Sequence, residues 1–273
     1  MQHASPASAH KGDSLARRIA SAVIGIPLLL LLVWLGGIWL TALAIVAALL
    51  GLQEFYRLSG VFRRWLQQAP GFLLAIILVL NGRWPTVWPL LPVVAGLLLL
   101  LLSHVGSPKS ARPWLLTLAG PLYVGATMAY AVLLRNIDQG MGWLLLALLG
   151  TFAVDTSAYF VGRAIGRHRM APKISPGKTW EGAIAGMTGG VGATFLLVAV
   201  LSLPLVLWKT AVLGAGIGVI AQAGDLLESA LKRSARAKEA GWLIPGHGGI
   251  LDRMDSIVFN LVLVYHFGTW GAT

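Results

Sequence analysis

Long, uninterrupted apolar stretches constrain this chain more than any other feature of its sequence. Stretches of roughly 20 apolar residues recur along it, and a helix of that length crosses the hydrocarbon core of a bilayer. They are continuously apolar rather than alternating, which argues against a β-barrel. Only 11% of the 273 residues are charged, whereas soluble domains average about 25%. The sequence therefore predicts an all-α, polytopic helical bundle embedded in a lipid bilayer.

The apolar stretches predict about nine transmembrane helices. Their ranges are 19–36, 38–57, 70–82, 89–103, 114–134, 142–161, 182–203, 210–231 and 256–271. The third and fourth are short, so the number of spans within residues 70–103 stays open. The chain divides into a polar tail, residues 1–18, N-terminal transmembrane helices, residues 19–141, and C-terminal transmembrane helices with polar loops, residues 142–273. We expect the first apolar run to be retained, because no small-residue cleavage site follows it promptly.

The distribution of basic residues predicts the orientation in the membrane. With the N-terminus in the cytoplasm, 18 of the 21 Lys and Arg residues lie in cytoplasmic segments, as the positive-inside rule requires. The polar loops at about 162–181 and 232–255 then share the cytoplasmic side. The net charge of +11 is explained in part by loops that face anionic lipid. Nucleic acid is not an expected partner, because no soluble domain is present to bind it.

Two carboxylates interrupt apolar spans. Asp155 and Asp225 lie within or near the ends of predicted helices, where a carboxylate costs at least ~2.5–3.5 kcal/mol unless it faces partners or water. We favour a functional role, the alternative being a structural ion pair with Arg163 or Lys232. Asp225 also begins a helical face that continues with Glu228, Ser229 and Lys232 at the spacing i, i+3, i+4, i+7.

Residues 229–255, called here the signature segment, are dense in charge and glycine. Four cations come first, at Lys232, Arg233, Arg236 and Lys238. The glycines around His247 allow a tight turn whose amides can approach a phosphate, and His247 is a candidate donor or acid, or a side chain satisfied within the turn. Asp252 and Asp255 follow at i, i+3, which suits Mg²⁺, although capping of a helix N-terminus explains one of them. No second His or Cys stands at zinc-ligand spacing.

A second polar loop precedes the seventh predicted span. It offers Ser175, Lys178 and Thr179 just before a helix N-terminus, a combination that suits phosphate oxygens. It is not a P-loop, because Pro172 stands where the first glycine of that motif belongs. The alternative is a positive-inside loop that binds no ligand.

These motifs together resemble a known family. The matching positions are Asp155, Ser175, Pro176, Lys178, Thr179, Glu181, Gly182, Gly224, Asp225, Leu226, Ser229, Lys232, Arg233, Lys238, Pro245, Gly246, His247, Gly248, Gly249, Asp252, Arg253 and Asp255. The chain resembles the phosphatidate cytidylyltransferase (CDP-diacylglycerol synthase) family over about its last 120 residues. It departs from the family at Glu239, where an aspartate is usual.

The resemblance implies transfer of CMP from CTP to phosphatidate, in a bacterial-type inner membrane with the active site facing the cytoplasm. It implies Mg²⁺, with a second metal ion left open. The implied catalytic residues are Asp225, Asp252, Asp255, His247 and Lys232. The implied metal ligands are Asp225, Asp252, Asp255 and Asp155. The implied substrate-binding residues are Ser175, Lys178, Thr179, Ser229, Arg233, Lys238, Arg253, Gly248 and Gly249.

Other readings stay open at this point. The acceptor could be another lipid, such as an isoprenoid glycerol phosphate, or CTP could serve as the phosphate donor to a polyprenol. An ion transporter is less favoured, because the charged residues gather at one membrane edge instead of spreading through the spans. The stripe Gly182, Gly186 and Gly190 allows close approach of another helix, and helix packing alone is the favoured explanation of it. A homodimer is expected from the resemblance and from the same stripe.

Overall fold

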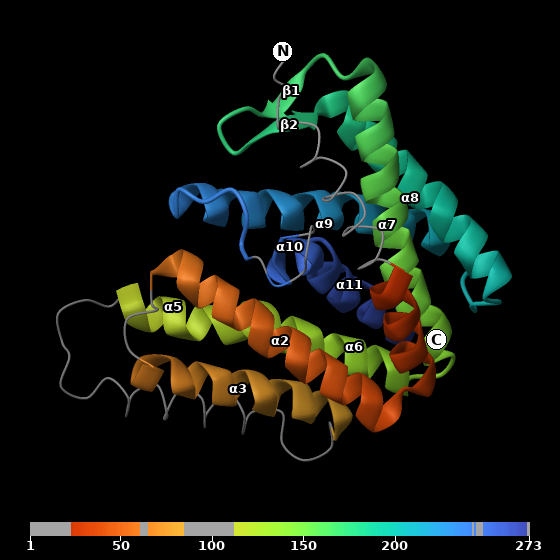
Figure 1. The fold of residues 1–273 in the computed structure, drawn as a ribbon. Helices are drawn as coiled ribbons and strands as arrows, with labels where there is room; N and C mark the ends of the chain where they lie inside the picture. Colours follow the sequence, from red (N-terminus) through yellow and green to blue (C-terminus); the bar gives the residue numbers. More distant parts are fainter. Residues whose placement is uncertain (1–22, 61–64, 85–111, 242, 244–247, 272–273) are drawn as a thin grey trace, which may run out of the picture.

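The computed structural model describes residues 23–60, 65–84, 112–241, 243 and 248–271 (Figure 1). Within these ranges the elements are α2 Gly37–Ser59, α3 Trp65–Arg83, α5 Arg112–Gly120, the π-helix η1 Pro121–Ala126, α6 Thr127–Asn136, α7 Gly140–Ile165, β1 Arg169–Ala171, β2 Ser175–Thr179, α8 Trp180–Val200, α9 Leu207–Ser234, α10 Leu251–Met254 and α11 Ile257–Gly271. A further apolar helix covers Val23–Leu35.

The predicted all-α membrane fold is confirmed. Among the described residues, five helices are long and apolar enough to cross a membrane: Gly37–Ser59, Leu115–Asn136, Gly140–Ile165, Trp180–Val200 and Leu207–Ser234. The helices Val23–Leu35 and Gln68–Arg83 are apolar but shorter. The chain is an integral membrane protein, although the count of nine spans is not confirmed. The predicted span 89–103 and the polar tail 1–18 lie outside the described residues.

A sharp turn at Gly36 separates the first helix from α2, where the sequence predicted a break between two spans. Gly36 has a φ of 62°, a conformation that glycine adopts without steric cost. From α6, Arg135 donates from Nε to the Val33 carbonyl and from Nη2 to the Trp34 carbonyl, both at 3.3 Å. These bonds satisfy carbonyl groups at the end of the first helix and tie the turn to α6.

Helix α8 packs against α7 and α9 (Figure 1). Gly182, Gly186 and Gly190 are all buried. A Cβ on Gly182 would lie 2.8 Å from the Ala158 carbonyl oxygen of α7, and one on Gly218 of α9 would lie 2.7 Å from the Cα of Met187. The stripe is therefore used for contacts within one chain, and it does not support the expected homodimer.

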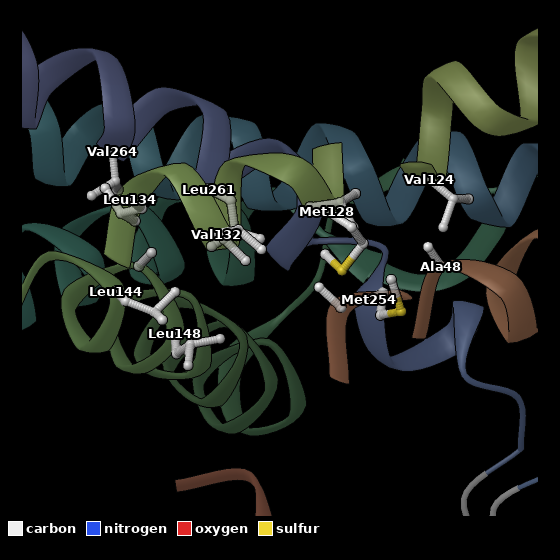
Figure 2. Close-up of a cluster of buried hydrophobic side chains, with 14 of the residues drawn as sticks. Ala48, Val124, Met128, Val132, Leu134, Leu144, Leu148, Met254, Leu261 and Val264 are labelled. Carbon is white, nitrogen blue, oxygen red and sulfur yellow. The ribbon is translucent and has the colours of Figure 1, made fainter. Parts of the chain in front are cut away.

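Helix α10 is short, but it is firmly packed. Figure 2 shows Met254 of α10 close to Met128 of α6 and to Ala48 of α2, and all three side chains are buried. Leu251, at the start of α10, is completely buried. The end of the signature segment is thus anchored in the core between the N-terminal and C-terminal helices.

The loop predicted between the sixth and seventh spans contains an antiparallel hairpin. Strand β1 pairs with β2, with Arg169 opposite Thr179 and Ala171 opposite Ser175. The hairpin lies at one end of the bundle, and β2 contacts α9 (Figure 1). Its last residue, Thr179, caps α8 by accepting a hydrogen bond from the Gly182 amide at 3.2 Å. Strand β2 is therefore held between α8 and α9.

Candidate active site

The last two turns of α9 carry the polar face that the spacing predicted. Asp225, Glu228, Ser229 and Lys232 lie on it, and Glu228 is completely buried. Glu228 forms an ion pair with Lys232 one turn later. A charge at such a position requires a partner, and each carboxylate of this face is paired with a lysine.

The partner of Asp225 comes from the hairpin. Lys178 Nζ lies 2.8 Å from Asp225 Oδ2 and donates to the Gln222 carbonyl at 3.2 Å. The Ser229 hydroxyl donates to Asp225 Oδ1 at 3.2 Å. The two polar loops expected on one side of the membrane therefore meet at Asp225.

Lys232 also has a second partner, Asp252 of α10. Lys232 Nζ donates to Asp252 Oδ1 at 2.7 Å. Asp252 Oδ2 accepts the backbone amides of Ala240 and Gly249, both at 2.9 Å. Burial alone would raise the pKa of Asp252, but the bonds from Lys232 and Gly249 hold it below its usual value. Asp252 is thus an ionised carboxylate with both oxygens engaged by the protein.

Three other carboxylates lie close enough to repel one another. Burial and then the negative charge of Asp225 raise the pKa of Asp255 to about 7, and Asp155 adds to this effect. One Asp255 oxygen accepts the Ser256 amide at 2.7 Å. Asp155, Asp225 and Asp255 therefore form an acidic group with excess negative charge.

This acidic group fits a magnesium ion that arrives with a substrate. In the described part of the chain, no three His, Cys, Asp or Glu residues are grouped closely enough to form a metal cage by themselves. Mg²⁺ usually takes only one or two carboxylates and completes its shell with water and substrate phosphates. Any two of Asp155, Asp225 and Asp255 would meet that requirement. Asp252, also predicted as a metal ligand, is engaged more firmly than Asp225, because it accepts two backbone amides as well as Lys232. Among the described residues, the partners of Asp225 are only the side chains of Lys178 and Ser229.

A cavity of about 710 Å³ opens onto the acidic group. Most of its wall is apolar and comes from the helix Val23–Leu35, α2, α6 and α7. Its polar end is formed by Asp155, Asp252, Arg253 and Asp255. A space of this shape suits a molecule with a long apolar part and a charged head.

Comparison with known proteins identifies the family. The profile of the cytidylyltransferase family matches residues 16–270. The chain belongs to this family. It is 37% identical to the phosphatidate cytidylyltransferase of Brucella abortus biovar 1 (strain 9-941), over 94% of each chain. It is 34% identical to that of Synechocystis sp. (strain ATCC 27184 / PCC 6803 / Kazusa), over 92% of this chain and 95% of the relative. With that of Staphylococcus haemolyticus (strain JCSC1435) the identity is 31%, over 90% and 96%.

The other predicted site residues of this cytidylyltransferase have varied surroundings. Arg233 is exposed, and its Nε donates to the Ile174 carbonyl at 3.1 Å, which ties the hairpin to α9. Ser175 is half-buried on β2, and Lys238 is exposed. Gly249 gives its amide to Asp252, so that amide is not directed at a phosphate. His247 lies outside the described residues.

Gly248 lies beside the same carboxylate, with a φ of 82°. A Cβ at this position would lie 3.0 Å from Asp252 Oδ2. Only glycine adopts that backbone conformation without strain. Gly248 therefore lets the chain pass closely over Asp252, and its role toward a substrate stays a prediction.

Sequence reasoning overlooked one acidic residue of this cytidylyltransferase. Glu54 lies in the predicted span 38–57 and is 3% exposed. Its Oε1 accepts the Ile250 amide at 3.2 Å, and its Oε2 accepts the Leu251 amide at 2.8 Å. The criterion that selected Asp155 and Asp225, a carboxylate inside an apolar helix, would have found it.

Proposed function

We propose that this chain is a phosphatidate cytidylyltransferase, which transfers CMP from CTP to phosphatidate and yields CDP-diacylglycerol and pyrophosphate. The observation that carries the proposal is the cavity. Its apolar body matches acyl chains, and its polar end presents Arg253 beside the acidic group. Membership of the cytidylyltransferase family supports the same activity.

The reaction requires alignment and neutralisation of charge. An oxygen of the lipid phosphate forms a bond to the α-phosphorus of CTP, and the bond from that phosphorus to the oxygen bridging to the β-phosphate breaks. The electron pair of the broken bond leaves with pyrophosphate. Because the attacking phosphate is already anionic, no strong general base is needed, and the rate depends on positioning and electrostatics. Lys178 and Arg253 are cations placed beside the acidic group, and they are suited to hold phosphates there.

Mg²⁺ belongs to the same proposal. Asp225 and Asp255 would hold it, with Asp155 as a further ligand. When bound, it neutralises charge on the nucleotide phosphates. Lys232 acts differently in this scheme, because it fixes Asp252 and compensates Glu228. A second metal ion stays a prediction.

The orientation in a bacterial inner membrane, with the active site facing the cytoplasm, is also part of the proposal. The distribution of basic residues supports it, since 18 of 21 fall on the predicted cytoplasmic side. This is the side from which CTP is supplied. The homodimer remains an expectation of the family resemblance alone.

The test is synthesis of labelled lipid by the purified protein in detergent. With Mg²⁺, phosphatidate and CTP labelled at the α-phosphate, we expect label in CDP-diacylglycerol and unlabelled pyrophosphate. A parallel reaction with an isoprenoid glycerol phosphate distinguishes the alternative acceptor, and CTP labelled at the γ-phosphate detects phosphate transfer to a polyprenol. Labelled lipid formed only with another acceptor, or no labelled lipid at all, contradicts the proposal.

A further inference from the structure

Two carboxylates from distant parts of the chain accept three consecutive backbone amides. Asp252 accepts the amide of Gly249, and Glu54 accepts those of Ile250 and Leu251. We propose that Glu54 is a positioning residue for CMP transfer, which holds the end of the signature segment so that Asp252, Arg253 and Asp255 line the polar end of the cavity. The inference rests on the proposed function for its catalytic consequence, but not for the contact itself.

The chain is shaped around the Glu54 carboxylate. A Cβ added to Gly241 or to Gly249 would collide with the Glu54 carboxylate oxygens, so both positions require a residue without a side chain. One turn along α2, Arg57 donates from Nη2 to the Ala240 carbonyl. Glu54 and Arg57 therefore bind the described residues on both sides of the stretch 241–249, Ala240 before it and Ile250 and Leu251 after it.

The charges in this region alternate. The positive charge of Arg57 attracts the Glu54 carboxylate, whereas the negative charge of Asp252 repels it. Lys232 compensates Asp252 on the opposite side. A buried carboxylate that accepts two amides is well satisfied, so Glu54 can remain next to a second carboxylate.

This arrangement has a consequence for substrate binding. The amides of residues 249–251 are not available to a substrate phosphate. Asp252 accepts the first of them, and Glu54 accepts the other two. The substrate phosphates are therefore left to the side-chain cations. Gly241 and Gly249 leave room for Glu54, and Gly248 leaves room for Asp252.

Removal of Glu54 leaves two amides without their acceptor. Arg253 and Asp255, which line the polar end of the cavity, follow Leu251 by two and four residues, so a shift of this segment displaces both groups. Displacement of catalytic groups by about 1 Å can cost ~100-fold in rate. Glu54→Gln preserves shape, but its amide group can accept only one of the two hydrogen bonds. The protein should fold while the segment loosens.

The first measurement is hydrogen exchange at residues 248–254 in the full-length protein. In Glu54→Gln we expect protection of the Ile250 and Leu251 amides to fall at least about tenfold, as for a local opening. Gln53→Ala is the matched control, because Gln53 is an exposed neighbour on the same helix. Unchanged exchange in Glu54→Gln overturns the proposal.

The second measurement is steady-state CMP transfer by the folded fraction of each variant. For Glu54→Gln we expect kcat to fall about tenfold or more while the KM for CTP changes less than about threefold. A purely structural residue would lower the yield of folded protein but leave its kcat intact, and that result overturns the positioning role. If the wild-type protein transfers no CMP, the proposed function fails, and the exchange result then decides whether Glu54 holds the segment.

Discussion

Lys232 Nζ lies 2.7 Å from Asp252 Oδ1 and also pairs with Glu228, so one buried cation serves two carboxylates. The exposed fractions of the three side chains are 14% for Lys232, 7% for Asp252 and 0% for Glu228. Helix α9 and the signature segment are joined by this cluster. The position of Asp252 relative to α9 therefore depends on Lys232.

Replacement of the shared cation should destabilise the protein strongly. Lys232→Met leaves two buried carboxylates unpaired, and breaking such a pair costs about 3–5 kcal/mol. For a chain of this size we expect the Tm in detergent to fall by roughly 10 °C. Lys238→Met is the control, since Lys238 is exposed, and its Tm should stay within about 1 °C of the wild type. Equal Tm values for the two variants would contradict the buried role of Lys232.

Asp225 should matter for activity far more than for stability. In its pair with Lys178, the Lys178 side chain is 20% exposed and the Asp225 side chain is 34% exposed. A pair that water reaches contributes about 1 kcal/mol or less. Asp225→Asn should therefore keep a nearly normal Tm. If Asp225 holds Mg²⁺, CMP transfer should fall by at least about 100-fold. Substantial activity at saturating Mg²⁺ would remove Asp225 from the metal site.

How much of the site was predictable depended on whether the contacts were local. The α9 face followed from helical spacing. The shared side of the two loops was predicted, but the pair of Lys178 with Asp225 was not, because the sequence suggested Arg163 or Lys232 as the partner. The amides that Asp252 accepts were not predictable, because they depend on how the chain folds back from Ala240 to Gly249. Glu54 contacts a segment almost two hundred positions away, and no local pattern reveals such a pair.

The fold shows the same division between local and distant signals. Apolar length located the helices and the break at Gly36, since both are local properties. The hairpin was missed because its two strands are short, and the strand Ser175–Thr179 contains Pro176 and Gly177, which are poor strand formers. The glycine stripe in α8 favoured helix packing, but its partners in α7 and α9 depend on tertiary packing that the spacing does not specify.

Removal of metal should abolish activity without unfolding the protein. Because the described carboxylates do not form a complete cage, we expect Mg²⁺ alone to shift the Tm by less than about 1 °C, as weak binding would. Mg²⁺ and CTP together, at about 100 times the Kd, should add ~2.7 kcal/mol of stability. Thermal unfolding in the presence of EDTA, Mg²⁺, CTP or both ligands measures this. A large stabilisation by Mg²⁺ alone would indicate a preformed site.

The apolar wall of the cavity should govern the use of lipid and leave the use of CTP unaffected. Ala47 of α2 lines the cavity, whereas its neighbour Val46 is exposed and does not. Ala47→Trp adds a large ring to the space proposed for an acyl chain. We expect the KM for long-chain phosphatidate to rise about tenfold, comparable to the loss of one or two buried methylene contacts, with the KM for CTP unchanged.

Val46→Trp is the matched control and should behave as the wild type. A short-chain phosphatidate should be used equally by both variants, because it does not reach the added ring; equal loss with short and long chains would show that the cavity does not hold the lipid.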